Sequence, residues 1–206
     1  MIRDLAKFLI VLGLVCLVTG GGVAALYAVF KADIERRDQA ARDEAVRAVL
    51  PDGAAADLEK PLALNPATGD AVFAATQDGR TVAYVASAGA QGYSSVVRVM
   101  VGVRAEDLAI IRVVVLSQQE TPGLGAHVAE RISNFTLWEK VFGPSERGKT
   151  EQLVNPFLDR FRGKKDTEIR DIQGITAATI TSNATKAAVG VAVGEIRKAV
   201  ETAHKP

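Results

Sequence analysis

The sequence predicts an α+β protein in which one N-terminal transmembrane helix is followed by a twisted antiparallel sheet packed with helices. Three observations lead to this prediction. An uncharged apolar run lies near the N-terminus, from Phe8 to Phe30. Four β-rich segments with short connections occupy the middle of the chain, and helical patterns flank them on both sides. Strands joined by short turns favour antiparallel pairing, and helices set apart from the strands favour an α+β arrangement.

The apolar run predicts a single membrane-spanning helix. It exceeds the roughly 20 residues that cross a bilayer as a helix, and it is too long for the apolar part of a signal peptide. We therefore expect residues 1–31 to be an uncleaved anchor. Gly20-Gly21-Gly22 either lets another membrane helix approach closely or simply adds flexibility. Basic residues flank both ends of the run, so charge alone does not fix its orientation. The short N-terminal tail and large C-terminal domain favour a domain outside the cytoplasm.

Residues 32–60 are predicted to be a helical linker. Ala32–Leu50 carries apolar residues at helical spacing, and the turn residues Pro51-Asp52-Gly53 end the pattern. The stretch from Pro51 to Asp70 is loop-like. Four strands are then predicted, with an Asp-Gly hairpin turn between the first two and a glycine-bearing loop at residues 89–93. The predicted strands are Ala71–Thr76, Thr81–Ala88, Val96–Arg104 and Ala109–Leu116.

Two helices are predicted after the strands, from Val128 to Phe142 and from about Ser182 to Ala203. In the first, Trp138 and Phe142 lie four residues apart, and this spacing favours a core contact over a cofactor platform. A basic, turn-rich stretch, Phe157 to Asp171, precedes the second helix.

Composition limits the possible functions. The chain has 206 residues, 48% of them hydrophobic and 24% charged, with a net charge of +1. These values exclude wholesale disorder and do not suggest a nucleic-acid partner. One cysteine, Cys16, permits neither an internal disulfide nor a multi-cysteine cluster. His127 and His204 have no ligand partner at useful spacing, so we expect no zinc or haem site. We also find no Gly-x-Gly-x-x-Gly, Walker or Ser-His-Asp pattern, and we predict no catalytic residue.

Two loops are candidates for a binding site. In Glu120-Thr121-Pro122-Gly123-Leu124-Gly125, the glycines and proline indicate special backbone angles that let a ligand approach, or else a plain strand-to-helix connection. The segment Gly174–Ala184 is nearly all small and hydroxyl residues, with Thr181, Ser182 and Asn183 as candidate helix caps. The start of a helix favours an anion. On spacing alone an ordinary capped helix is the simpler interpretation, and the alternative is that Thr179 holds a phosphate.

Together the two loops resemble a known family. Glu120–Gly125 resembles the Glu-Thr-Pro-Gly-Leu-Gly loop of the covalent-FMN-binding domain. Residues 176–182 resemble its flavinylation motif, usually Ser/Thr-Gly-Ala-Thr-x-Thr-Ser. That domain occurs in the G subunit of the Rnf ferredoxin–NAD electron-transport complex and in the C subunit of the sodium-pumping NADH:quinone reductase. The single anchor is also similar to that family, and the short length is closer to the Rnf protein than to its quinone-reductase relative. Two positions differ, since Ala177 replaces the usual Gly and Gln173 the usual Asp; the first matters if the backbone there needs a positive φ.

The resemblance implies that Thr179 carries FMN as a phosphoester, made by a dedicated flavin transferase from FAD with Mg²⁺. Residues 61–206 would then form the FMN-binding domain. Thr176, Thr181 and Ser182 would donate hydrogen bonds to the phosphate oxygens, and Leu124 would lie against the isoalloxazine ring. The implied cofactor-binding residues besides Thr179 are Thr176, Ala177, Ala178, Thr181, Ser182, Glu120, Thr121, Gly123, Leu124 and Gly125.

The resemblance also implies a function. The chain would be a membrane-anchored flavoprotein subunit that relays electrons within an ion-translocating ferredoxin:NAD oxidoreductase complex, and not a catalyst alone. Its partners would be the other membrane subunits, membrane lipid and, during maturation, the flavin transferase. Its soluble domain would lie on the periplasmic side of the bacterial inner membrane. Two alternatives stay open: the equivalent subunit of a sodium-pumping NADH:quinone reductase, or a non-redox membrane-anchored assembly module that has lost the flavin.

Overall fold

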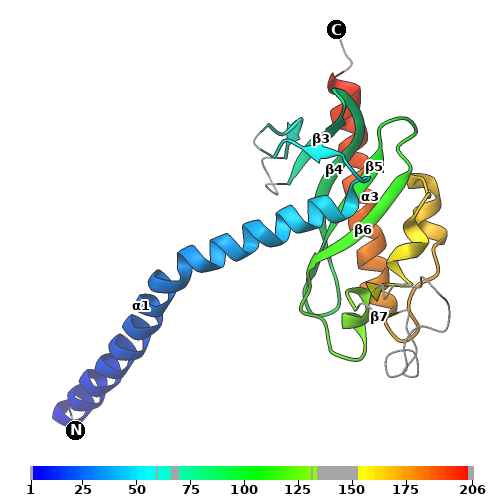
Figure 1. Cartoon of the computed structure of the whole chain (residues 1–206). Coiled ribbons are helices and arrows are strands. Elements are labelled where there is room, and N and C mark those ends of the chain that lie inside the picture. Colours follow the sequence, from blue (N-terminus) through cyan, green and yellow to red (C-terminus); the bar gives the residue numbers. More distant parts are fainter. Residues whose placement is uncertain (1, 59, 66–69, 131, 134–152, 204–206) are drawn as a thin grey trace, which may run out of the picture. The chain divides into compact units, whose positions relative to one another are not determined.

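A computed structural model describes residues 2–58, 60–65, 70–130, 132–133 and 153–203 (Figure 1). Its contacts divide the chain into two compact units, Met1–Asp43 and Glu44–Pro206, and each is described by itself. The sequence-based division into anchor, linker and binding domain stays a prediction.

The first unit is helical. It contains most of α1, Ile2–Val49, whose last residues belong to the second unit. Within the described residues, α1 is the one helix long and apolar enough to cross a membrane, and none of its apolar window is buried. The predicted anchor and the predicted linker helix are thus one continuous helix, because no helix-breaking residue separates Phe30 from Ala32.

An antiparallel sheet forms the centre of the second unit, and this confirms the predicted α+β class (Figure 1). The strand order is β1-β3-β4-β5-β6, and β2 also pairs with β3. All four predicted strands are present within a few residues of their expected bounds. The strands are β1 Ala55–Ala56, β2 Ala63–Leu64, β3 Ala71–Gln77, β4 Arg80–Gln91, β5 Val96–Arg104 and β6 Ile110–Ser117.

The hairpins follow local sequence signals. Asp78 and Gly79 join β3 to β4 with φ of 52° and 77°, as a two-residue turn with two positive φ angles requires. The glycine-bearing loop predicted at residues 89–93 is shorter than expected, because β4 pairs with β5 as far as Gln91 and Val96. Likewise, the stretch predicted as loop between Pro51 and Asp70 contains β1 and β2, which add to the edge of β3.

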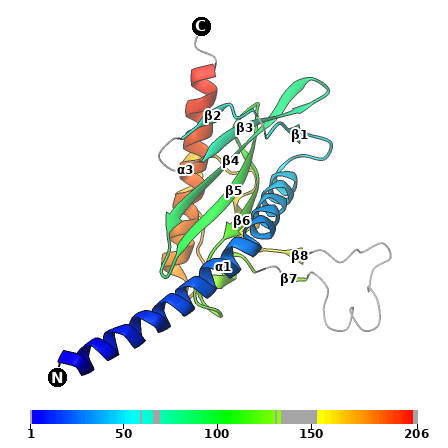
Figure 2. The ribbon, with the colours of Figure 1, turned by 90° about the vertical axis from the view of Figure 1, so that its left-hand side faces the viewer.

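Both faces of the sheet are buried. On one face α3, Thr179–Ala203, packs over the strands, and alternate residues of β5 such as Val99 and Val101 enter this core (Figure 2). On the other face the end of α1 covers Ala83, Val85 and Met100. A strand buried on both sides explains why β5 is almost continuously apolar in the sequence.

The C-terminal half differs from the prediction in two places. α3 begins at Thr179, three residues before the predicted Ser182, so Thr181, Ser182 and Asn183 lie inside the helix and do not cap it. Tertiary contacts favour the earlier start, because the Thr181 side chain donates to Glu120 and the Ser182 side chain accepts from Ile175, both outside the helix.

The helix predicted from Val128 is wrong at its start. Residues Gly125–Val128 form the 3₁₀ helix η1, and Ile132–Ser133 is strand β7, paired with β8, Leu153–Val154. The remainder of that predicted helix, with Trp138 and Phe142, lies outside the described residues. The turn-rich stretch is confirmed as two 3₁₀ helices, η2 Leu158–Phe161 and η3 Asp166–Asp171.

Candidate functional site

The two candidate loops meet at the carboxylate of Glu120. The Thr181 hydroxyl donates a hydrogen bond of 2.6 Å to Glu120 Oε2, although the two residues lie 61 positions apart. Both are buried, with 6% of Glu120 and 2% of Thr181 exposed. The segments that carry the family resemblance therefore form one structure around a single side chain.

A third segment joins them, the hairpin between β4 and β5. The backbone N–H groups of Tyr93, Ser94 and Ser95 donate to the Glu120 carboxylate over 3.2, 3.0 and 2.9 Å. The Ser95 hydroxyl donates to it as well, over 3.1 Å. With Thr181, five neutral donors surround the carboxylate. This hairpin is the part of the site that the sequence-based residue set missed, although the sequence did indicate a glycine-bearing loop at residues 89–93.

Two glycines make room for this carboxylate. A Cβ on Gly92 would lie 2.7 Å from Glu120 Oε1, and a Cβ on Gly125 would lie 2.6 Å from Thr181 Oγ1 and 2.8 Å from Glu120 Oε2. Such distances are shorter than any real contact of a Cβ atom. Gly125 is therefore required by packing against Glu120, and Gly123, with φ of 77°, by backbone conformation.

Glu120 is ionised across the physiological pH range. Burial is the largest single influence and opposes ionisation, but the hydrogen bonds from Thr181, Ser95 and Ser94 together outweigh it. They lower the pKa of Glu120 from its usual 4.5 to about 2. Because the ionised carboxylate only accepts, the Thr181 proton is directed at Glu120.

The loop that precedes α3, residues 174–178, is ordered by hydrogen bonds to its backbone. Ile175 N–H donates to Ser182 Oγ over 2.9 Å, Ala178 N–H donates to Ile175 O over 3.1 Å, and Ser182 N–H donates to Ala178 O over 2.9 Å. Between them Ala177 adopts φ of 65°, the left-handed conformation that a glycine would favour. This turn places Ala178 in the core and leaves Thr176 and Thr179 exposed.

The start of α3 is suited to an anion. Thr179 is the first residue of a 25-residue helix with no acidic residue in its first turn. The first N–H groups of a helix lack intrahelical partners, and the helix dipole favours negative charge there. Arg160 donates to Gln173 O over 2.8 Å, and Lys186 donates to Ile172 O over 3.2 Å. These contacts fix the chain that enters the loop and keep positive charge beside it.

The predicted residues divide into exposed and buried sets. Thr121, Gly123 and Leu124, which follow Glu120 in the chain, are exposed, and so are Thr176, Ala177 and Thr179. Gly125, Ala178, Thr181 and Ser182 are buried. Among the described residues, no buried side-chain nitrogen or oxygen lacks a hydrogen-bond partner. A cofactor at this site would therefore lie on the surface, against the exposed set, and the residues present are chemically suited to a phosphate with an apolar neighbour.

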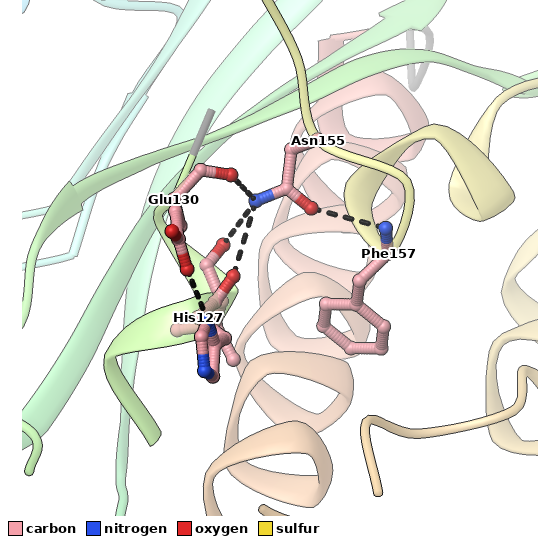
Figure 3. A network of polar contacts seen from close by, with 5 residues as sticks. His127, Glu130, Asn155 and Phe157 are labelled. Carbon is pink, nitrogen blue, oxygen red and sulfur yellow. Dashed lines mark hydrogen bonds and ion pairs between the residues drawn. The ribbon is translucent and has the colours of Figure 1, made fainter. Parts of the chain in front are cut away.

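Asn155 makes a set of contacts that the sequence did not reveal, with the segment that follows the Glu120–Gly125 loop (Figure 3). The Asn155 amide donates to Val128 O and Glu130 O over 3.0 and 2.8 Å. Its oxygen accepts from the N–H groups of Phe157 and Leu158, each over 3.0 Å. Asn155 thereby connects the end of η1 to the start of η2. His127 and Glu130 pair with each other on the same segment.

Comparison with known proteins finds relatives that are similar in sequence. The chain is 28% identical over 186 residues to the G subunit of the proton-translocating ferredoxin:NAD(+) oxidoreductase complex of Clostridium ljungdahlii, covering 90% of this chain and 88% of that protein. It is 38% identical over 102 residues to the G subunit of the ion-translocating oxidoreductase complex of Vibrio atlanticus, covering 50% and 43%. With the Vibrio cholerae protein of that name the identity is 27% over 212 residues, covering 99% and 96%.

The family match includes every segment that meets at Glu120. The sequence model of the FMN-binding domain matches residues 92–194, from the glycine of the β4–β5 hairpin to the middle of α3. The resemblance identified from two loops is confirmed. The match covers half of the chain, and this chain belongs to the FMN-binding domain family.

Proposed function

We propose that the chain is the flavoprotein subunit of an ion-translocating ferredoxin:NAD oxidoreductase complex, equivalent to the G subunit of its relatives. In this role it relays electrons through FMN bound covalently to Thr179, and it is not a catalyst alone. The relatives that cover most of the chain support the proposal, since they are named as the G subunit of such complexes. The family match supports FMN as the cofactor.

The observation that carries the covalent attachment is the position of Thr179. Thr179 is exposed and is the first residue of α3, beside N–H groups that favour an anion. The resemblance implies the reaction: the threonine oxygen bonds to the phosphorus on the FMN side of FAD, AMP leaves, and the hydroxyl proton is released. The phosphodiester keeps one negative charge, which the helix start stabilises.

The remaining residues bind and orient the group. When bound, FMN supplies the redox chemistry. We assign Thr176 and the first-turn N–H groups to the phosphate oxygens, Thr121 to a polar contact, and Leu124 to the ring. Thr181 and Ser182 are buried, and we propose that they act by fixing the loop through Glu120 and Ile175.

We further propose that α1 anchors the chain in the bacterial inner membrane, with the FMN-binding domain of residues 61–206 on the periplasmic side. Residues 1–31 would be the anchor, in contact with lipid and with other membrane subunits, and residues 32–60 the linker. The apolar, unburied window of α1 supports the anchor. A flavin transferase would be a transient partner during maturation.

Two alternatives make different predictions. The equivalent subunit of a sodium-pumping NADH:quinone reductase would carry the same modification but co-purify with different neighbours. A non-redox assembly module would keep the fold and carry no flavin, and the replacements Gln173 and Ala177 are the features that favour it.

The test is the mass of the full chain after co-expression with a flavin transferase. We expect wild type to gain about 440 Da, the mass that FMN adds as a phosphoester. Thr179→Ala should not gain this mass, and its band on a denaturing gel should show no flavin fluorescence. Thr81→Ala, which removes an exposed threonine of β4, is the matched control and should be flavinylated fully. An unmodified wild-type chain, made with a transferase that modifies a known substrate, contradicts the proposal.

A further inference from the structure

The carboxylate of Glu120 carries a negative charge that no cation in the described part of the chain neutralises. Its hydrogen-bond donors are backbone N–H groups and hydroxyls, all of them neutral. Among the described residues, no lysine, arginine or histidine forms an ion pair with it. Neutral donors stabilise an ionised carboxylate without cancelling its charge. A buried negative charge therefore lies where the three segments of the site meet.

This charge lies close to Thr179. Glu120 Oε2 is 2.6 Å from the hydroxyl of Thr181, which is two residues after Thr179 in the first turn of α3. At a helical rise of about 1.5 Å per residue, the carboxylate is on the order of 10 Å from the backbone of Thr179. The Debye length at 0.1 M salt is about 10 Å, and buried charges are screened less than exposed ones. The field of Glu120 therefore reaches a group attached at Thr179.

The segments around Glu120 add no charge that would offset this field. No charged side chain occurs in residues 89–97, 121–126 or 175–185. Arg160 and Lys186 donate to backbone carbonyls of residues 170–173. At pH 8 the reduction of a flavin adds more electrons than protons, so the flavin gains negative charge. A fixed negative charge nearby disfavours this gain.

We propose that the buried carboxylate of Glu120 acts as a fixed charge that lowers the midpoint potential of the flavin linked to Thr179. The inference rests on the proposed function, because the phosphoester keeps the flavin near the carboxylate. Glu120 itself gains and loses no electron and no proton. It changes the energy of the electrons that the flavin accepts from one redox partner and passes in equal number to the next.

The test uses the full chain, flavinylated by co-expression and purified in detergent at pH 8. Intact mass and circular dichroism first establish that each variant carries FMN and is folded. The equilibrium between the flavin and a dye of known potential is then measured by absorbance. In Glu120→Gln we expect the equilibrium constant to move towards reduced flavin, by about 2-fold if water screens the field fully and about 15-fold at an effective dielectric constant of about 20.

Two controls separate charge from contact. Glu120→Asp shortens the side chain but keeps its charge, and the equilibrium constant should match wild type. Glu201→Gln removes a charge at an exposed position near the end of α3 and should also match wild type. A purely structural role of Glu120 predicts instead that Glu120→Asp and Glu120→Gln shift the equilibrium alike, and that result overturns the proposal.

A second pair of variants tests the field while Glu120 keeps its contacts. Ser94 is exposed, and the contact that it makes with Glu120 Oε1 comes from its backbone N–H. Ser94→Lys places a positive charge beside the carboxylate and should favour reduced flavin relative to Ser94→Gln, an uncharged side chain of similar length. This pair decides the matter if Glu120→Gln does not fold.

The remaining outcomes distinguish this inference from the proposed function. An equilibrium constant equal to wild type in flavinylated Glu120→Gln overturns the fixed charge and leaves the attachment at Thr179 standing. Equal constants in Ser94→Lys and Ser94→Gln do the same. Absence of FMN from wild type overturns the proposed function, and the inference about Glu120 with it.

Discussion

Replacing Glu120 by glutamine isolates the charge that holds the three segments of the site together. The two side chains have nearly the same shape, so the variant changes hydrogen bonding with little change in packing. An amide oxygen at the Oε1 position can still accept from Ser94, Ser95 and the Ser95 hydroxyl. The amide nitrogen then occupies the Oε2 position, where it meets the N–H of Tyr93, another donor.

The lost free energy can be estimated from the pKa. A carboxylate whose pKa falls from 4.5 to about 2 on folding contributes about 3 kcal/mol to stability at pH 7, at 1.36 kcal/mol for each pKa step. Glutamine keeps the hydrogen bonds at the Oε1 position, but its amide N–H group would face the backbone N–H of Tyr93, and two donors cannot pair. We therefore expect Glu120→Gln to lower the free energy of unfolding by about 2–4 kcal/mol at pH 7.

The dependence on pH gives a sharper criterion. The folded pKa is depressed, so the contribution is fully present above the unfolded pKa of 4.5 and is lost as the pH falls through the folded value of about 2. Between pH 7 and pH 3 the wild type should lose about 2 kcal/mol through this group, by proton linkage. Glutamine does not titrate, so Glu120→Gln should lack this component.

The measurement is urea unfolding of the full chain in detergent at pH 7 and pH 3, followed by circular dichroism. Glu201→Gln, at an exposed position near the end of α3, makes the same charge change and serves as the control. It should match wild type at both pH values. The reasoning is refuted if Glu120→Gln unfolds within about 0.5 kcal/mol of wild type at pH 7, the range of an ordinary surface substitution. It is also refuted if this variant keeps the full wild-type dependence on pH.

Two further predictions concern the backbone. Ala177→Gly should raise the free energy of unfolding by about 0.5–1 kcal/mol, because glycine adopts the left-handed φ of 65° without strain. The gain is partly offset because glycine loses more conformational freedom on folding than alanine does. Ala178→Gly, at the next and buried position, should lower the free energy of unfolding. Gly102→Ala should destabilise the chain by about 1–3 kcal/mol, since its Cβ would overlap the carbonyl oxygen of Val49 in α1. Gly190→Ala, where an added Cβ would meet no other part of the chain within 4 Å, is the control and should not destabilise. Urea midpoints check both pairs, and destabilisation by Ala177→Gly or a neutral Gly102→Ala contradicts them.

Local patterns were sufficient for the sheet. The β-branched runs, the Asp-Gly turn at residues 78–79 and the short connections are signals that act within a few residues of the chain. They gave β5 its observed bounds and placed β3, β4 and β6 within a few residues. The signals were weaker where tertiary contacts decide the conformation. Examples are the added pairing of β1 and β2 with β3, and the segment after η1, which Asn155 holds through contacts between residues 25–27 positions apart.

The sequence predicted the two loops of the site, but it did not predict that the Glu120 carboxylate lies at the centre of the site. Glu120 was included as a residue of a glycine-rich loop, but nothing local in the sequence indicates that its carboxylate reaches Thr181 or the N–H groups of residues 93–95. The start of α3 was misplaced for the same reason. Thr181 and Ser182 have the composition of helix caps, and only their contacts with Glu120 and Ile175 explain why they lie inside the helix.

The exposed position of Thr179 depends more on these contacts than on the conformational preference of the residues in the loop before it. Alanine at position 177 adopts its left-handed φ at a cost of about 1 kcal/mol that glycine would avoid. The conformation persists because Ser182 accepts from Ile175 on one side of it and Thr181 donates to Glu120 on the other. Both contacts come from the first turn of α3, the helix that begins at Thr179. Alanine in place of the family's usual glycine therefore reduces stability, while the helix and the buried carboxylate still hold the Thr179 hydroxyl at the surface.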